Sequence, residues 1–137
     1  MIDTSVLVAG LVANHEFHAR ARPLVVEATG ARIPGIVLAE TWSVLRRAPF
    51  HLDAGVVADA LAPWATAARV AETSVGAYVE VLRIGRGLHL GGNVHDLLIA
   101  YTCAAAGGRM ATLDRQQAAL ARDVPGLDVE LLLPEPS

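Results

Sequence analysis

The apolar positions of this chain fall into short, strand-like runs separated by longer segments with helical periodicity. Runs that suit brief buried strands occur at residues 1–3, around Ile33, and at 69–71, 110–113 and 129–133. Segments that suit helices occupy residues 6–12, 15–29, 36–47, 53–64, 74 to about 85, 94–106 and 115–121. Strands that alternate with helices at these intervals predict an α/β fold, with a parallel sheet covered by helices on both faces.

Caps and breakers support these boundaries. Asp53 and Ser74 are of the residue types that cap helix N-termini, Pro49 closes the third helical segment, and Gly107-Gly108 ends the long apolar one. No repeat or low-complexity linker divides the chain. With 137 residues, of which 53% are hydrophobic, we expect a single domain spanning residues 1–137.

Composition narrows the function classes. The net charge of −3 and the pI near 5.9 give no basic signature of nucleic-acid binding. All 11 basic residues are arginines. Because the chain also has 25 alanines, we interpret the absence of lysine as part of a general composition bias. The absence of lysine from the sequence excludes the lysine of a P-loop and a lysine Schiff base.

The chain carries no membrane or export signal that we can identify. No apolar run approaches the roughly 20 residues that span a bilayer, and no arginine precedes Arg20, which argues against a secretory signal. The single cysteine, Cys103, cannot form an intramolecular disulfide and is expected to be a small buried side chain. We therefore expect a cytoplasmic protein with no membrane association.

Four carboxylates, Asp3, Glu40, Asp96 and Asp114, lie within or at the ends of the most apolar stretches. A helical count places Glu40 and Asp96 on apolar faces of their helices. Unpaired buried carboxylates cost several kcal/mol each unless they bind a proton or a cation. If the fold brings the four together, a hard divalent cation with oxygen ligands, Mg2+ or Mn2+, is the expected occupant.

Two of the acids have a simpler structural explanation. Asp114 can cap the helix that follows it, and Asn93 with Asp96 resembles a capping box. Glu40 lies in the middle of a helix on its inner face, where glutamate is rarely buried unpaired. Four coincident exceptions favour one shared site.

Other chemical signals are weaker. Arg86 in the glycine-rich loop GRGLHLGG, Arg46 and Arg47 after Glu40, and Arg115 are candidate phosphate contacts, each with a solvated surface arginine as the alternative. The segment His15-Glu16-Phe17-His18 lacks the histidine spacing of a zinc protease helix and is interpreted as a helix start. The loop GRGLHLGG gives no dinucleotide fingerprint, because no strand directly precedes it.

The ordered segments MIDTSVL, LAETWSVLRR, GGNVHDLLIAYTCAAAG and MATLDR together resemble a PIN domain, and specifically the VapC-type toxins of bacterial toxin–antitoxin pairs. The resemblance covers nearly the whole chain. It departs from the family at the start, where only Met1 and Ile2 precede the first aspartate. Either the first strand is short or translation begins upstream.

The resemblance implies a three-layer α/β/α sandwich with a central parallel sheet. It also implies Mg2+- or Mn2+-dependent endoribonuclease activity, with the acidic positions carried by Asp3, Glu40, Asp96 and Asp114 and the family's threonine by Thr112. An RNA substrate, a VapB-like antitoxin and a homodimer follow as expected partners, and Arg86, Arg115 and Thr112 as candidate substrate contacts. The rival hypotheses are a non-catalytic interaction module of the same fold and, more weakly, phosphotransfer through Asp3.

Overall fold

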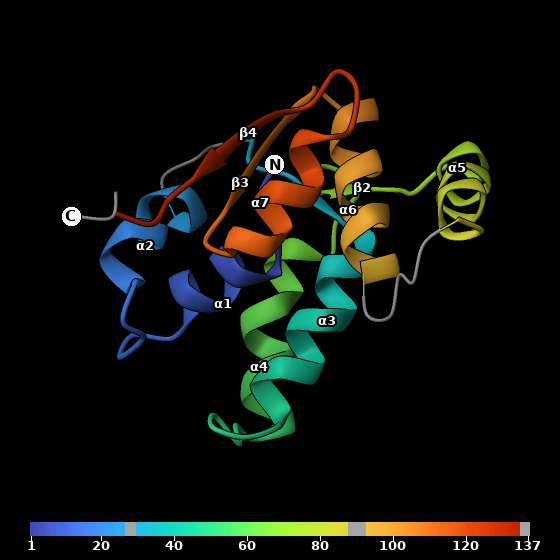
Figure 1. The fold of residues 1–137 in the computed structure, drawn as a ribbon. Helices are drawn as coiled ribbons and strands as arrows, with labels where there is room; N and C mark the ends of the chain where they lie inside the picture. Colours follow the sequence, from blue (N-terminus) through green and yellow to red (C-terminus); the bar gives the residue numbers. More distant parts are fainter. Residues whose placement is uncertain (27–29, 88–92, 135–137) are drawn as a thin grey trace.

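The computed structural model describes residues 1–26, 30–87 and 93–134 of the chain (Figure 1). Its four strands are β1 (Ile33–Pro34), β2 (Val70–Ala71), β3 (Arg109–Thr112) and β4 (Asp128–Leu131). Strand β1 pairs in parallel with β2, and β3 pairs in parallel with β4. The α/β class and the parallel pairing predicted from the sequence are confirmed.

The N-terminal segment connects the two strand pairs. The Ile2 amide donates to the carbonyl of Arg32, just before β1, at 3.2 Å, and the Ala111 amide in β3 donates to the carbonyl of Met1 at 2.9 Å. Residues 1–3, predicted as a strand, form only an isolated parallel bridge between Ile2 and Ala111. The segment stays short because Asp3 already caps the following helix.

The helices follow the predicted order along the chain. They are α1 (Thr4–Leu11), α2 (His18–Val26), α3 (Gly35–Arg46), α4 (Ala54–Leu61), α5 (Val75–Gly85), α6 (Asn93–Ala105) and α7 (Arg115–Arg122), with a short 3-10 turn at Ala62–Trp64. The predicted caps are confirmed, since Asp53 accepts from the Gly55 amide and Ser74 from the Ala77 amide. In the described part of the chain, no helix is long and apolar enough to cross a membrane.

The second helix begins later than predicted. We expected a helix from His15, but α2 starts at His18. The His15 imidazole instead accepts a hydrogen bond from the Phe17 amide at 3.1 Å, and the two rings lie in contact with each other. Contacts made by the folded chain have here overridden the local helical pattern.

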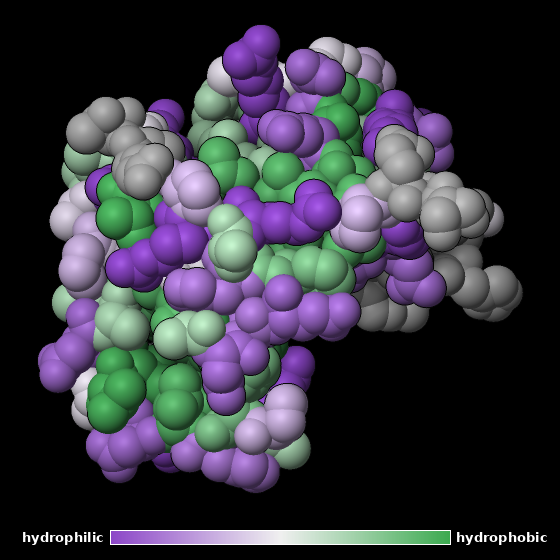
Figure 2. All heavy atoms as spheres, turned by 90° about the vertical axis from the view of Figure 1, so that its left-hand side faces the viewer, coloured by the Kyte–Doolittle hydropathy of each residue, from purple (hydrophilic) through white to green (hydrophobic). Residues whose placement is uncertain are grey.

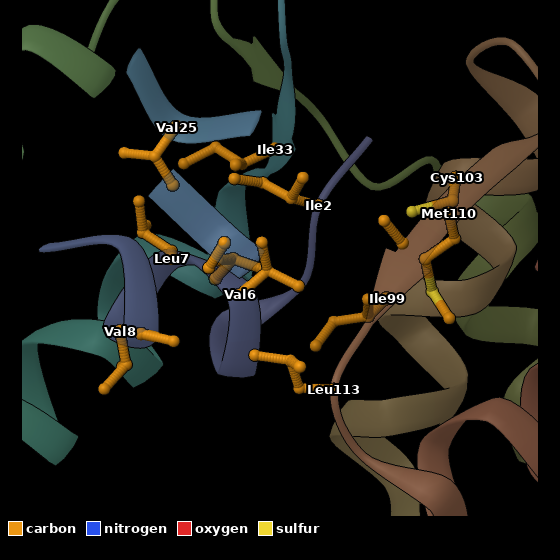
Figure 3. Packing of buried hydrophobic residues seen from close by; sticks show 14 of the residues in the cluster. Ile2, Val6, Leu7, Val8, Val25, Ile33, Ile99, Cys103, Met110 and Leu113 are labelled. Atoms are coloured by element: carbon orange, nitrogen blue, oxygen red, sulfur yellow. The ribbon is translucent and has the colours of Figure 1, made fainter. Parts of the chain in front are cut away.

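Helices α1 and α2 and the strands enclose the main core (Figure 3). Leu7, Ile33 and Met110 are buried in it, and Cys103 is buried as predicted. Helices α1 and α2 pack very closely at Gly10, where an added Cβ would lie 2.3 Å from Cγ2 of Val25. This contact leaves no room for a side chain at position 10.

Two parts of the molecule extend from this core. Helices α3 and α4 pack against each other as a pair that projects from the strands, and α5 lies beyond α6 (Figure 1). On the α2 side of the molecule, hydrophobic residues are interrupted by hydrophilic ones (Figure 2).

Candidate active site

The four acids predicted to share a site come from four different helices. Asp3 is the N-cap of α1, Glu40 lies in the middle of α3, Asp96 is in the first turn of α6, and Asp114 is the N-cap of α7. All four line the same cavity of about 590 Å³. The four helices meet there although the acids span more than 100 positions of the sequence (Figure 1).

Asp3 is the most buried of the four, with 4% of its surface exposed. Its Oδ1 accepts from the Ser5 hydroxyl at 2.6 Å and from the Val6 amide at 3.2 Å, and its Oδ2 accepts from the Thr112 hydroxyl. Burial raises its pKa from 3.8 to about 6, although these three hydrogen bonds favour the charged form and lower it. The charge of Asp114 raises this pKa further.

Glu40 and Asp96 are both partly buried and face the same cavity. Burial raises the pKa of each, and so does a neighbouring carboxylate: Asp96 acts on Glu40, and Asp114 acts on Asp96. The Oε1 atom of Glu40 is buried without a hydrogen-bond partner among the described residues. No arginine or histidine of the described ranges forms an ion pair with any of the four acids. His95 offsets part of the repulsion at both Glu40 and Asp96, but the pKa of each stays raised.

Asp114 has two roles. Its Oδ1 accepts from the amides of Gln116 and Gln117 at 2.8 and 3.1 Å, so its capping of α7 is confirmed. The residue is nevertheless exposed and lines the cavity beside the other acids. A capping carboxylate uses one oxygen for the helix, which leaves the second oxygen available to a ligand.

Gln117 is a cavity residue that the sequence analysis did not identify. It is 2% exposed, and its Nε2 donates to the backbone carbonyl of Asp96 at 3.1 Å. This hydrogen bond connects α7 to the first turn of α6 and so holds the backbone of Asp96 in place. The one local signal was its place three residues after Asp114, where a capping-box glutamine is common. Here the Asp114 amide donates to Thr112 instead.

The predicted substrate contacts are not all at the cavity. Arg115 lines it and is exposed, and its guanidinium donates to the carbonyl of Pro134 at 3.3 Å. Thr112 is fully buried behind Asp3, so it holds that carboxylate and does not line the cavity. Arg86 is the C-cap of α5 and is not among the cavity residues. The rest of its loop, residues 88–92, lies outside the described residues.

Apolar and aromatic side chains also line the cavity and are called here its aromatic wall. Phe17 and Phe50 line it together with His15 and Val44. The rings of His15 and Phe50 are stacked, with centroids 6.5 Å apart and planes inclined by 17°, and the His15 and Phe17 centroids are 6.1 Å apart. One cavity therefore combines a set of acids with a set of rings.

The comparison with protein families decides the identity. Residues 1–123 match the family described as the PIN domain. The chain belongs to the PIN-domain family. This PIN domain is 35% identical over 122 residues to Ribonuclease VapC40 of Mycobacterium tuberculosis (strain ATCC 25618 / H37Rv), an alignment that covers 82% of this chain and 84% of that protein. The same figures hold for Ribonuclease VapC40 of strain CDC 1551 / Oshkosh. The resemblance of this PIN domain to VapC-type proteins, inferred from four ordered motifs, is confirmed.

Proposed function

We propose that this PIN domain is a metal-dependent endoribonuclease that acts as the toxin of a type II toxin–antitoxin pair. The observation that carries the proposal is the meeting of Asp3, Glu40, Asp96 and Asp114 at one cavity. The name of the relative, a ribonuclease, supports RNA as the substrate. We further propose that residues 1–137 form one catalytic domain, arranged as a three-layer α/β/α sandwich around its parallel strands.

The four carboxylates would hold Mg2+ or Mn2+. Carboxylate oxygens are the ligands that such hard cations prefer. Oε1 of Glu40 has no hydrogen-bond partner among the described residues, and the pKa values of Asp3, Glu40 and Asp96 are all raised, so a bound cation would stabilise the charged carboxylates. Within the described ranges, no three acidic, histidine or cysteine side chains are close enough together to chelate an ion as they lie. When bound, such a cation lowers the pKa of a coordinated water and offsets charge on the phosphate.

The chain's own residues orient this site. Ser5 and Thr112 hold the Asp3 carboxylate in one position through their hydroxyl groups. Gln117 fixes the start of α6 through the Asp96 carbonyl. Arg115 lines the cavity and is placed to attract a phosphodiester, because a guanidinium can donate two hydrogen bonds to two oxygens of one phosphate.

The proposed partners follow from this assignment. A VapB-like antitoxin would place a basic side chain, most simply arginine, against the acids, because a guanidinium pairs bidentately with a carboxylate. We also propose a homodimer. The exposed apolar face of α5, formed by Val75, Tyr78, Val79 and Leu82, supports an interface there. An RNA-cleaving toxin would act in the cytoplasm, where its substrate is found.

Cleavage of RNA by the purified, antitoxin-free protein tests the proposal. We expect cleavage with Mg2+ or Mn2+, none with EDTA, and none by Asp96→Asn. The matched control is Asp59→Asn, which changes an exposed aspartate of α4 outside the cavity and should cut normally.

Two results would contradict the proposal. Equal cleavage with and without chelator would refute the metal mechanism. RNA binding without cleavage in either metal would favour the non-catalytic module. Co-expression with a neighbouring small protein should suppress growth arrest caused by the wild type, and persistent arrest with that protein bound would refute its inhibitory role.

A further inference from the structure

The aromatic wall of the cavity has no task in the metal chemistry. His15 and Phe17 lie in the connection between α1 and α2, and Phe50 lies in the connection between α3 and α4. All three side chains are partly buried and line the same cavity as the four acids. Phe17 and Phe50 pack against the main core but stay partly exposed, and both line the cavity, where a ligand can reach them.

We infer that His15, Phe17 and Phe50 form a subsite that stacks one unpaired RNA base next to the phosphodiester that is cut. The inference rests on the proposed ribonuclease function and assigns these three residues to the binding of one base of the substrate. Every base has a flat π-face, so aromatic side chains bind unpaired bases by stacking with little dependence on sequence. A base held inside a duplex cannot reach such a ring.

The size and continuity of the cavity support a nucleotide as the occupant. Its volume of about 590 Å³ lies within the range of about 300–1,000 Å³ that is usual for small-molecule sites. The acids and the rings line the same cavity. A nucleotide with its phosphate beside the acids would therefore reach the rings with its base.

The orientation of His15 adds a hydrogen-bond donor to this wall. Its Nδ1 accepts from the Phe17 amide at 3.1 Å, so Nδ1 carries no proton. In the neutral ring, the proton then lies on Nε2, which can donate to an oxygen or ring nitrogen of the nucleotide. The nearly parallel ring of Phe50 supports the imidazole in this position.

The test uses a short single-stranded RNA that is cut at one bond, and a series of the same RNA with an abasic nucleotide at each position around that bond. We expect one abasic position beside the bond to lower kcat/KM of the wild type by about 5- to 150-fold, the range usual for losing one stacked base. In Phe50→Leu, which removes the ring but keeps an apolar side chain, the same abasic position should have little further effect. Phe50→Tyr should behave as the wild type.

The control is Trp42→Leu, which removes an exposed aromatic ring on α3 outside the cavity and should retain the full abasic effect. An abasic effect of equal size in the wild type and in Phe50→Leu would overturn the inference, as would a wild type indifferent to every abasic position. Phe50→Leu that cuts RNA normally but loses antitoxin binding would assign these rings to a protein partner instead and overturn it too. Failure of the wild type to cut intact RNA is a separate result that refutes the proposed function itself.

Discussion

Replacing Asp3 with asparagine removes the most strongly perturbed carboxylate of the site and keeps its shape. The amide oxygen of asparagine can still accept from the Ser5 hydroxyl and the Val6 amide, and asparagine caps helices as well as aspartate does. The amide nitrogen can donate to the Thr112 oxygen, from which Asp3 now accepts. The substitution therefore changes the charge with little change in packing.

The magnitude follows from the pKa of Asp3. A rise from 3.8 to about 6 corresponds to roughly 3 kcal/mol, because each pKa unit is worth about 1.4 kcal/mol. Below pH 3.8 the carboxyl is protonated in both the folded and the unfolded chain, and this stability is fully present. Between pH 3.8 and about 6 the carboxyl ionises in the unfolded chain but stays largely protonated in the folded one, so this stability is lost progressively and is gone once the pH has passed about 6. Asp3→Asn has no such loss.

Urea unfolding of the wild type and Asp3→Asn in EDTA, at several values between pH 4 and pH 7.5, measures the effect. We expect the free energy of unfolding of the variant, minus that of the wild type, to increase by up to about 3 kcal/mol over this range. The raised pKa values of Glu40 and Asp96 affect both proteins, so most of their contribution cancels in the difference. Added Mg2+ should stabilise the wild type more than the variant, since ligand binding stabilises the state that binds it.

A difference that stays constant with pH, or that falls as the pH rises, would refute this reasoning. It would mean that the hydrogen bonds to the Asp3 carboxylate outweigh its burial and that its charge stabilises α1. Equal stabilisation of both proteins by Mg2+ would show that Asp3 does not bind the metal.

Three further substitutions and treatments have defined outcomes. Glu40→Gln should abolish cleavage and, in EDTA at neutral pH, leave the melting temperature unchanged or raised, because it removes a repelled and partly buried charge. Gly10→Ala should lower the free energy of unfolding by about 1–2 kcal/mol, since the new Cβ collides with Val25 and the better helix propensity of alanine offsets only part of this. Cys103 should resist thiol reagents in the native protein at pH 8, because burial raises its pKa to about 12.

Each of these has its own check. For Gly10→Ala the matched control is Gly76→Ala in α5, where the added Cβ meets only ordinary contacts and should stabilise by up to about 1 kcal/mol. Destabilisation of both variants by the same amount would remove the packing argument. A clear drop in the melting temperature of Glu40→Gln would mean that the carboxylate stabilises α3, and rapid labelling of native Cys103 would mean that its helix opens readily.

The sequence predicted those features that depend on neighbours along the chain. Caps such as Asp53 and Ser74 act within one helical turn, so residue type and position suffice to identify them. The four acids could be selected because a carboxylate in an apolar segment is costly wherever it folds. Their meeting at one cavity required the tertiary structure.

Features that arise only from packing were missed. Phe17 and Phe50 belong to different connections, and nothing in their local sequences indicates that both reach His15. Gln117 had the position of an ordinary capping residue, yet its side chain contacts the start of another helix. Arg86 stays a predicted phosphate contact, and it lies at the C-terminal end of α5, outside the residues that line the cavity.

The connection between α3 and α4 lies beside the acids, but it contributes a ring to the cavity and no carboxylate. On the proposed assignment, the stacking ring of Phe50 and the four acids belong to different stretches of the gene. If Phe50 stacks a base as proposed, exchange of residues 47–53 between related proteins would alter how tightly an unpaired base is held while leaving Asp3, Glu40, Asp96 and Asp114 untouched. Such a division would let short loop changes alter the grip on RNA without rebuilding the acidic site.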